Sequence, residues 1–499
     1  MTQVHVAFAD APAGTSSPDI AYRTAKGKRD PRFVLACRIL SCVIPFAFWA
    51  APLPLDRPIQ HTLAITLFMV IAWITEAFDH AITGFIGCYL FWVLGIVASR
   101  ESSNFPVAFS GFADDTTWFL FGAILFGMMA TKSGLADRIA YAIMSVVGDS
   151  YSRILLGLII SDFLLTLVVP SAISRIVVMA AVGMGLMNVF GLGKGSNVGR
   201  GIFIILTYCA NIFDKMIIAG APSILARGLI EKYGHVKVLY SHWLLAYLPC
   251  SILTILAAWL IALWLYPPEI DRLPGGVDFL RQRREAMGLL TRIEKKALVL
   301  MGFALVLWLT DFLHPLSPSM VGLGIGLVAV MPGIGILDID DVKKVDFLPV
   351  FFVAAALSMG NVLVHTGALE MIKGVLFNWM GAHISGSYGS TLILYWTAFV
   401  YHLVLGSEIP MLSTSIPPLM QYALSHNLNP LAIGMAWTFA AGGKLFVYQS
   451  GAMIVGYAYG FFEPKDMFKV GLCLTIVESL ILLFLVPHYW PLLGIPMTP

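Results

Sequence analysis

The sequence contains few charged residues. Asp, Glu, Lys and Arg make up 12% of its 499 residues, whereas hydrophobic residues make up 58% and the mean hydropathy is +0.83. Soluble globular domains carry about 25% charged residues, so this composition excludes an ordinary soluble domain and indicates a polytopic membrane protein. The net charge is only +2 and the basic residues lie in separate loops, so nucleic acid is not an expected partner.

Cysteine and catalytic motifs are also scarce. The six cysteines are scattered through apolar segments, with no Cys-x-x-Cys pair and no Cys/His spacing typical of zinc ligands. Neither a disulfide framework nor a zinc site is therefore expected. The sequence also lacks a Walker lysine motif, a Rossmann fingerprint and a hydrolase nucleophile elbow in a suitable context. These absences disfavour an ATP-driven pump and a hydrolase, so we expect no enzymatic activity and no organic cofactor.

Long apolar segments recur along the chain. A helix that crosses a bilayer needs about 20 apolar residues. Eleven segments fit this requirement: 34–51, 59–78, 81–98, 117–131, 201–226, 242–266, 297–313, 318–333, 347–365, 431–460 and 470–488. The segments 153–190 and 389–420 are too long for one crossing and are interrupted in the middle, which is typical of re-entrant hairpins. The sequence therefore predicts an all-α membrane protein with about eleven transmembrane helices and two re-entrant helical hairpins.

Basic residues indicate the orientation in the membrane. They precede the first span and crowd the loop at 267–296. Because cytoplasmic loops are enriched in Lys and Arg, we place both segments in the cytoplasm. Residues 1–30 lack a signal-peptide core and are expected to form a flexible cytoplasmic tail. The expected location is the bacterial inner membrane, with a cytoplasmic N-terminus.

The two halves of the chain repeat the same features in the same order. Gly127 and Gly134 recur as Gly360 and Gly367 with identical spacing, and a hairpin and a long interrupted helix follow each pair. Each half contains an odd number of crossings, so the second copy is expected to be inverted relative to the first. The predicted segments are a first transmembrane helix at 31–57, a first repeat at 58–266 with hairpin 153–190 and broken helix 201–226, a basic loop at 267–296, a second repeat at 297–488 with hairpin 389–420 and broken helix 431–460, and a C-terminal tail at 489–499.

Polar motifs interrupt the hairpins and the long helices. The hairpin tips read Pro170-Ser171-Ala172-Ile173-Ser174-Arg175 and Gly406-Ser407-Glu408-Ile409-Pro410, and the helix breaks read Gly220-Ala221-Pro222-Ser223 and Gln449-Ser450-Gly451-Ala452. Polar backbone at membrane depth is tolerated only where it lines a cavity or is buried in protein. In inverted-repeat transporters such breaks form the binding site near the middle of the membrane. The four breaks therefore indicate a secondary transporter.

Several motifs match one known family. They are Phe112-Ala113-Asp114-Asp115-Thr116-Thr117-Trp118, Lys132-Ser133-Gly134-Leu135, Pro170-Ser171 with Arg175, and Phe462-Glu463-Pro464-Lys465-Asp466-Met467 with Gly471. With these motifs the chain from about residue 30 onward resembles the divalent anion/sodium symporter family, which carries dicarboxylates, citrate or sulfate. The resemblance implies an inverted-repeat fold, a homodimer and an elevator-like movement of a transport domain against a scaffold.

The chain departs from this family at the site itself. In the family each hairpin tip carries Ser-Asn-Thr and each broken helix a Gly-Thr-Pro-Pro-Asn-like turn, which bind the substrate carboxylates beside carbonyl groups that help to hold sodium. Here the tips read Ser171-Ala172-Ile173 and Ser407-Glu408-Ile409, so only the serines persist. The broken helices lose the family's Asn in both halves. The way in which the family binds sodium and dicarboxylates therefore cannot be assigned unchanged to this chain.

The breaks can still bind an anion. A helix N-terminus presents unpaired N–H groups and the positive end of the helix dipole, which hold a carboxylate without any particular side chain. Arg175 is the first choice for recognition, because a guanidinium can form two parallel bonds to a carboxylate; the alternative is a fixed partner within the hairpin. The predicted substrate-binding residues are Ser171, Ala172, Ile173, Ser174, Arg175, Ala221, Pro222, Ser407, Glu408, Ile409, Ser450 and Gly451.

The candidates for cation coupling are Glu408, Asp214, Lys215, Gly220 and Lys444. A carboxylate at an anion site repels the substrate unless it is protonated or offset by a cation. Glu408 is therefore interpreted as a proton or sodium ligand, with a salt-bridged structural acid as the alternative. Lys215 and Lys444 are interpreted as fixed charges in place of bound sodium. The alternative is that they are ordinary lysines whose long side chains extend to the water at the membrane surface. The expected coupling ions are Na⁺ or H⁺, without a permanent metal centre.

Three classes of function remain. The first is a secondary transporter of a small organic dianion, such as a C4-dicarboxylate or a related di- or tricarboxylate, driven by sodium, protons or exchange. The second is transport of an inorganic oxyanion such as sulfate, or ion/proton antiport, within the same superfamily. The third is a membrane-embedded enzyme, which is disfavoured because Ser171 and Arg175 lack a neighbouring base. The expected partners are a small anion, the lipid bilayer and a second copy of the chain.

Overall fold

The computed structural model describes residues 31–498, apart from 97–103, 271, 273–274, 383 and 385. The described part is helical and contains no β-strand, only an isolated bridge between Ser150 and Arg272. The prediction of an all-α fold is therefore confirmed. The predicted tail at 1–30 lies outside the described residues.

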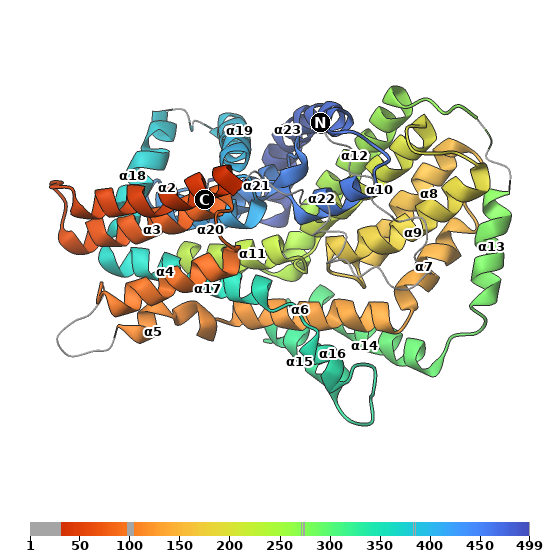
Figure 1. Cartoon of the computed structure of the whole chain (residues 1–499), viewed down its shortest axis with the longest axis horizontal. Helices are drawn as coiled ribbons and strands as arrows, with labels where there is room; N and C mark the ends of the chain where they lie inside the picture. Colours follow the sequence, from red (N-terminus) through yellow and green to blue (C-terminus); the bar gives the residue numbers. More distant parts are fainter. Residues whose placement is uncertain are drawn as a thin grey trace.

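The helices of the first half are α2 (Pro31–Ala50), α3 (Arg57–Thr75), α4 (His80–Val93), α5 (Phe105–Ala108), η1 (Ser110–Ala113), α6 (Asp115–Lys132), α7 (Leu135–Met144), α8 (Tyr151–Thr166), α9 (Ala172–Phe190), α10 (Asn197–Met216), α11 (Ala221–Gly234) and α12 (Tyr240–Leu265). After α13 (Gly276–Ala286), the second half contains α14 (Arg292–Leu309), α15 (Pro318–Val330), α16 (Ile339–Lys343), α17 (Leu348–Thr366), α18 (Ala368–Phe377), η2 (Asn378–Ala382), α19 (Gly386–Leu405), α20 (Glu408–Ser425), α21 (Pro430–Ala440), η3 (Val447–Gln449), α22 (Gly451–Ala458), α23 (Pro464–His488) and η4 (Trp490–Leu493). Figure 1 shows α13 at one end of the molecule and α2, α3 and α4 together at the opposite end.

The order α6 to α12 matches the order α17 to α23. In each series a long helix turns at a glycine into a ten-residue helix, α7 or α18. The turning residues are Gly134, with φ 80°, and Gly367, with φ 76°. Such angles lie in the left-handed region, which glycine adopts without steric cost. The glycines that reveal the repeat in the sequence therefore form the same bend in both halves.

The two series also pack against each other reciprocally. Helix α6 packs on α15, and its counterpart α17 packs on α4. Helix α11 packs on α20, and α22 packs on α9. Each half therefore completes the helix packing of the other, as expected for two related repeats. The inversion of the second copy stays a prediction.

The number of membrane crossings is not settled by helix length. In the described ranges, eight helices are long and apolar enough to cross a bilayer, or nine if the pair α6 and α7, bent by 62°, is one span. Each of the eleven predicted spans contains a helix or a helix pair, but α4, α15 and α21 are short, and α14 begins with several charged residues. Two of the eight are the hairpin arms α9 and α19. Eleven crossings therefore remain a prediction.

Two segments differ from their predicted form. The predicted loop at 267–296 contains α13 and the first turn of α14, which begins at a capping box between Thr291 and Glu294. The predicted tail at 489–499 is packed against the protein, because Trp490 and Met497 are buried and the Met497 carbonyl accepts a hydrogen bond from the Asn429 N–H at 3.0 Å. In Figure 1, α13 runs across the direction of α6.

Candidate functional site

The two hairpin tips and the two helix breaks surround one cavity of about 450 Å³. The segments 170–173, 219–222, 407–410 and 449–452 all line it. This volume lies within the usual range for small-molecule sites, which is about 300–1,000 Å³. Four segments that are far apart in the sequence therefore form one site.

Four helix N-termini meet at this cavity. Ser171, Gly220, Ser407 and Ser450 are the residues immediately before α9, α11, α20 and α22, respectively. The Ser171 hydroxyl accepts a hydrogen bond from the Ser174 N–H, and the Ser450 hydroxyl accepts one from the Ala452 N–H. In the described structure, neither Gly220 nor Ser407 caps its helix through a side chain. The remaining N–H groups and the helix dipoles make the cavity suited to an anion.

The local sequence explains why the helices begin at these points. Pro222 lies in the first turn of α11, where a missing N–H costs nothing. Gly406, between α19 and α20, has φ 69°, which a residue with a Cβ adopts only with strain. The hairpin arms α8 and α9 pack together, as do α19 and α20. Proline, glycine and serine thus place the N-termini at the cavity.

Three buried charged side chains lie at the second tip. Glu408 Oε2 is 3.0 Å from Lys444 Nζ, and Glu408 Oε1 is 3.4 Å from Lys215 Nζ. Their residues are only 6%, 3% and 4% exposed, respectively, so water screens them little. Glu408 lines the cavity. The structure thus brings together three of the five predicted coupling residues, and one carboxylate faces two ammonium groups.

Asn211 connects this cluster to the second helix break. Its Oδ1 accepts hydrogen bonds from Lys444 Nζ at 3.1 Å and from the Ser450 hydroxyl at 2.7 Å. Its Nδ2 donates to the Thr207 carbonyl at 2.7 Å. Asn211 was not among the predicted site residues. The available signal was its position four residues before Lys215, which places both side chains on one face of α10.

Arg175 lies behind the first tip. It is fully buried, its Nε is 3.2 Å from Asp162 Oδ1, and its other nitrogens donate to the carbonyls of Val169 at 2.9 Å and Ala210 at 2.6 Å. Arg175 is not among the described residues that line the cavity. This placement differs from the prediction that Arg175 binds the anion directly. Its donors instead hold the end of the hairpin against α10.

Asp214 and Gly220 face each other at the first helix break. Both line the cavity. A methyl group at Gly220 would overlap the Asp214 carboxylate, so any larger residue there would displace that side chain. Asp214 Oδ1 is 3.8 Å from Arg175 and has no hydrogen-bond partner within the described part of the chain. Asp214 therefore lines the cavity with a carboxylate that the described protein atoms satisfy only in part.

Most predicted site residues line the cavity. These are Ser171, Ala172, Ile173, Ala221, Pro222, Ser407, Glu408, Ile409, Ser450, Gly451, Asp214 and Gly220. Ser174, Arg175, Lys215 and Lys444 lie behind this lining in the described structure, and the two lysines act on the cavity through Glu408 and Asn211.

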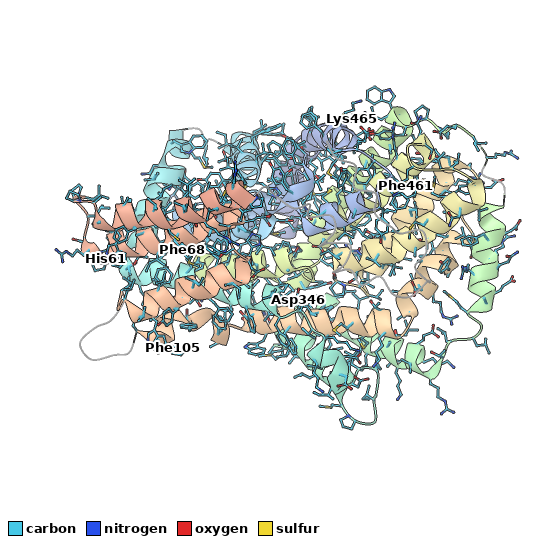
Figure 2. All side chains as sticks on the ribbon, in the orientation of Figure 1. His61, Phe68, Phe105, Asp346, Phe461 and Lys465 are labelled. Atoms are coloured by element: carbon cyan, nitrogen blue, oxygen red, sulfur yellow. The ribbon has the colours of Figure 1, made fainter. Side chains whose placement is uncertain are left out.

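The opposite wall was not predicted from the sequence. It includes Asp79 at the start of α4 and Asp346 before α17, and Asp346 is labelled near the middle of the molecule in Figure 2. Their carboxylates accept hydrogen bonds from Ala81 N–H at 2.9 Å and Leu348 N–H at 3.0 Å. Within the described ranges, no cluster of three or more His, Cys, Asp or Glu side chains could hold a metal ion. Asp79 thus caps α4, and Asp346 accepts from the first N–H group of α17.

Comparison with known proteins gives consistent matches along almost the whole chain. A family model described as "Sodium:sulfate symporter transmembrane region" matches residues 33–496. A membrane protein of Cupriavidus necator is 25% identical over 453 residues, covering 87% of this chain and 88% of that protein. An L-tartrate/succinate antiporter of Escherichia coli K12 is 24% identical over 485 residues, covering 90% of this chain and 96% of that protein.

Two further matches extend this pattern. A sodium-dependent dicarboxylate transporter, SdcS, of Staphylococcus saprophyticus is 24% identical over 462 residues and covers 87% of each chain. The crystal structure of the YdaH transporter of Alcanivorax borkumensis superimposes with a TM-score of 0.56 at 14% identity, covering 88% of this chain and 100% of that one. At this identity the structural match shows a shared fold.

Proposed function

This chain belongs to the sodium:sulfate symporter family, and we propose that it carries small organic dianions of the C4-dicarboxylate class across a membrane by secondary transport. The observation that carries the proposal is the convergence of four helix N-termini on one cavity. Relatives that cover most of the chain are named as carriers of tartrate, succinate or dicarboxylates.

The arrangement of the N-termini suits a ligand with two carboxylates. Helix α9 packs on α22, and α11 packs on α20. The four N-termini therefore form two pairs, each built from one hairpin arm and one broken helix of the other half. We name them the α9–α22 seat and the α11–α20 seat. Each seat offers N–H groups and two dipole ends to one carboxylate.

We further propose that fixed cations replace bound sodium, so that the carrier works by exchange. The ammonium groups of Lys215 and Lys444 both contact the single Glu408 carboxylate, so the formal charges of these three side chains sum to one positive charge. An anionic substrate offsets that charge directly, without a co-bound cation. One relative is named an antiporter, which agrees with exchange.

Coupling to sodium or protons is the second candidate. It is favoured by the cavity-lining carboxylates of Asp214 and Glu408, each with an oxygen that lacks a hydrogen-bond partner in the described structure. A relative named as sodium-dependent supports it. Transport of an inorganic oxyanion such as sulfate is the corresponding alternative for the substrate. The description of the matched family names sulfate.

The remaining parts of the proposal concern the assembly. We propose a homodimer in a bacterial inner membrane, with a cytoplasmic N-terminus and an elevator-like movement of the helices around the cavity. The basic residues before α2 and around α13 support this orientation. The packing of α9 on α22 and of α11 on α20 supports a transport domain that is built from both halves and moves against a scaffold.

Uptake into proteoliposomes tests the proposed substrate. Labelled succinate, citrate and sulfate are supplied outside, with the same unlabelled anion inside, and sodium and proton gradients are imposed in separate samples. We expect uptake of succinate that depends on internal succinate. Uptake of sulfate alone would favour the oxyanion alternative. No uptake of any of the three under any condition would contradict the proposal.

A further inference from the structure

Gln449 lies directly before the N-terminus of α22 and is fully buried. Its Oε1 accepts hydrogen bonds from the N–H groups of Leu445 at 2.6 Å and Phe446 at 2.8 Å. Two donors can face only an acceptor, so this end of the side-chain amide must be the oxygen. The orientation of the amide is therefore fixed by its neighbours.

The other end of this amide is unpaired. Gln449 Nε2 has no hydrogen-bond partner among the residues that the structure describes, although Gln449 lines the cavity. A buried amide that lacks partners for its hydrogens is unfavourable, so such groups are normally satisfied by protein, water or ligand. Gln449 Nε2 is thus a buried donor without a protein partner in the described structure, in a residue that lines the cavity beside the N-terminus of α22.

Both polar ends of the neighbouring Asn211 amide are already engaged. Asn211 uses Nδ2 on the Thr207 carbonyl and Oδ1 on Lys444 and Ser450. His402 Nε2 is 3.3 Å from the backbone oxygen of Gln449, which holds the turn in place. Asn211 and Gln449 both line the cavity, and of these two amides only that of Gln449 has a nitrogen without a hydrogen-bond partner in the described structure.

The two seats differ at this position. Gln449 precedes Ser450 at the start of α22, as Ala219 precedes Gly220 at the start of α11. Both Gln449 and Ala219 line the cavity. The α9–α22 seat therefore has a side-chain amide donor where the α11–α20 seat has a methyl group.

We propose that Gln449 Nε2 donates hydrogen bonds to the substrate carboxylate in the α9–α22 seat. Through this contact Gln449 determines which substrates the seat accepts. This inference rests on the proposed function, because it assigns one end of the proposed dianion. A site with buried donors discriminates strongly against ligands that lack the matching acceptor. The seat therefore selects a second carboxylate and disfavours monocarboxylates of similar length, such as butyrate.

The Gln449→Glu variant tests this role. Its affinity for succinate is measured on the purified protein by titration calorimetry and compared with that of the wild-type protein. Glu keeps an oxygen for the Leu445 and Phe446 N–H groups but replaces the donor with a negative oxygen. We expect the affinity for succinate to fall about 10- to 100-fold, the factor typical of a lost hydrogen bond to a charged group. A second variant, Gln449→Met, removes both polar atoms and should show a similar loss.

Gln60→Glu is the matched control. Gln60 is also buried, but its Nε2 donates to the carbonyls of Phe48, Trp49 and Ala51, away from the cavity. We expect this control to lower the melting temperature and leave succinate affinity unchanged.

The outcomes separate this inference from the proposed function. Wild-type affinity for succinate in both Gln449 variants would overturn the role of Gln449. A second outcome is that both variants bind succinate more weakly, and that the wild-type protein binds succinate but does not exchange it. This outcome would support the role of Gln449 and contradict the proposed transport. Absence of succinate binding by the wild-type protein would contradict both.

Discussion

Glu408 contacts both Lys215 and Lys444, and all three side chains are buried, so both lysines share one carboxylate as their charge partner. Removing one partner of a buried ion pair leaves an uncompensated charge and costs about 3–5 kcal/mol. The three residues come from α10, from the start of α20 and from the second helix break. Their charges therefore link stability to the geometry of the binding site.

We expect Lys444→Met to abolish sodium-independent exchange of succinate, because the substrate loses a fixed positive charge behind its seat. The melting temperature should also fall, since Asn211 and Glu408 lose their shared partner. Labelled succinate exchange in proteoliposomes measures the effect. The control is Lys343→Met, which removes an exposed lysine paired with Asp340 and should leave exchange intact. Exchange at the wild-type rate in Lys444→Met would contradict the fixed-cation proposal.

Glu408→Gln separates two roles of this residue. If Glu408 takes up a coupling ion, the variant should lose uptake driven by a sodium or proton gradient and keep exchange between identical anions. The measurement compares both modes in the same preparation of proteoliposomes. Unchanged sodium and pH dependence would remove Glu408 from any coupling role.

Arg175 gives a prediction about stability. Arg175→Met leaves the buried Asp162 without its cation, so we expect a loss of about 3–5 kcal/mol in unfolding free energy. The double variant Arg175→Met, Asp162→Leu should recover part of this loss, because the unpaired charge is removed as well. Thermal unfolding of the three proteins checks this. A normal melting temperature with lost succinate binding in Arg175→Met would instead indicate direct contact with the anion.

At the level of elements, the bend between α6 and α7 depends on the conformation of Gly134. An added Cβ would have space, because the nearest described atom is 3.8 Å away, so a substitution is penalised only by its positive φ. We expect Gly134→Ala to cost about 1–2 kcal/mol. Gly302→Ala, in α14 with no described atom within 4 Å and an ordinary φ, should gain about 0.5–1 kcal/mol. Equal melting temperatures for the two variants would contradict this account.

An ion pair beside this bend makes a prediction about pH. Lys132, at the end of α6, is 2.8 Å from Asp338, and this contact, with the Asp341 N–H, lowers the pKa of Asp338 from 3.8 to about 2. A carboxyl group with a lowered pKa stabilises the fold above its ordinary pKa and loses that effect as the pH falls through about 2. Asp338→Asn should therefore lower the melting temperature equally at pH 6 and pH 8. A different change in melting temperature at pH 6 and at pH 8 would show that another group titrates between these pH values.

For the whole molecule, the features visible in the sequence are those with local causes. Proline, glycine and serine within apolar segments reveal the four breaks, and Gly134 and Gly367 reveal the repeated bend. The choice between the two interpretations of Arg175 and the role of Asn211 depend on contacts between helices, which local patterns do not encode. Helix α13 was missed because it is short and mostly polar.

We propose that fixed lysines replace bound sodium in this carrier of organic dianions. The most direct test is the initial rate of labelled succinate uptake into proteoliposomes loaded with unlabelled succinate, in sodium chloride and in choline chloride. We expect equal rates in the two salts and almost no uptake without internal succinate. Uptake that requires an inward sodium gradient and ignores internal succinate would contradict the account.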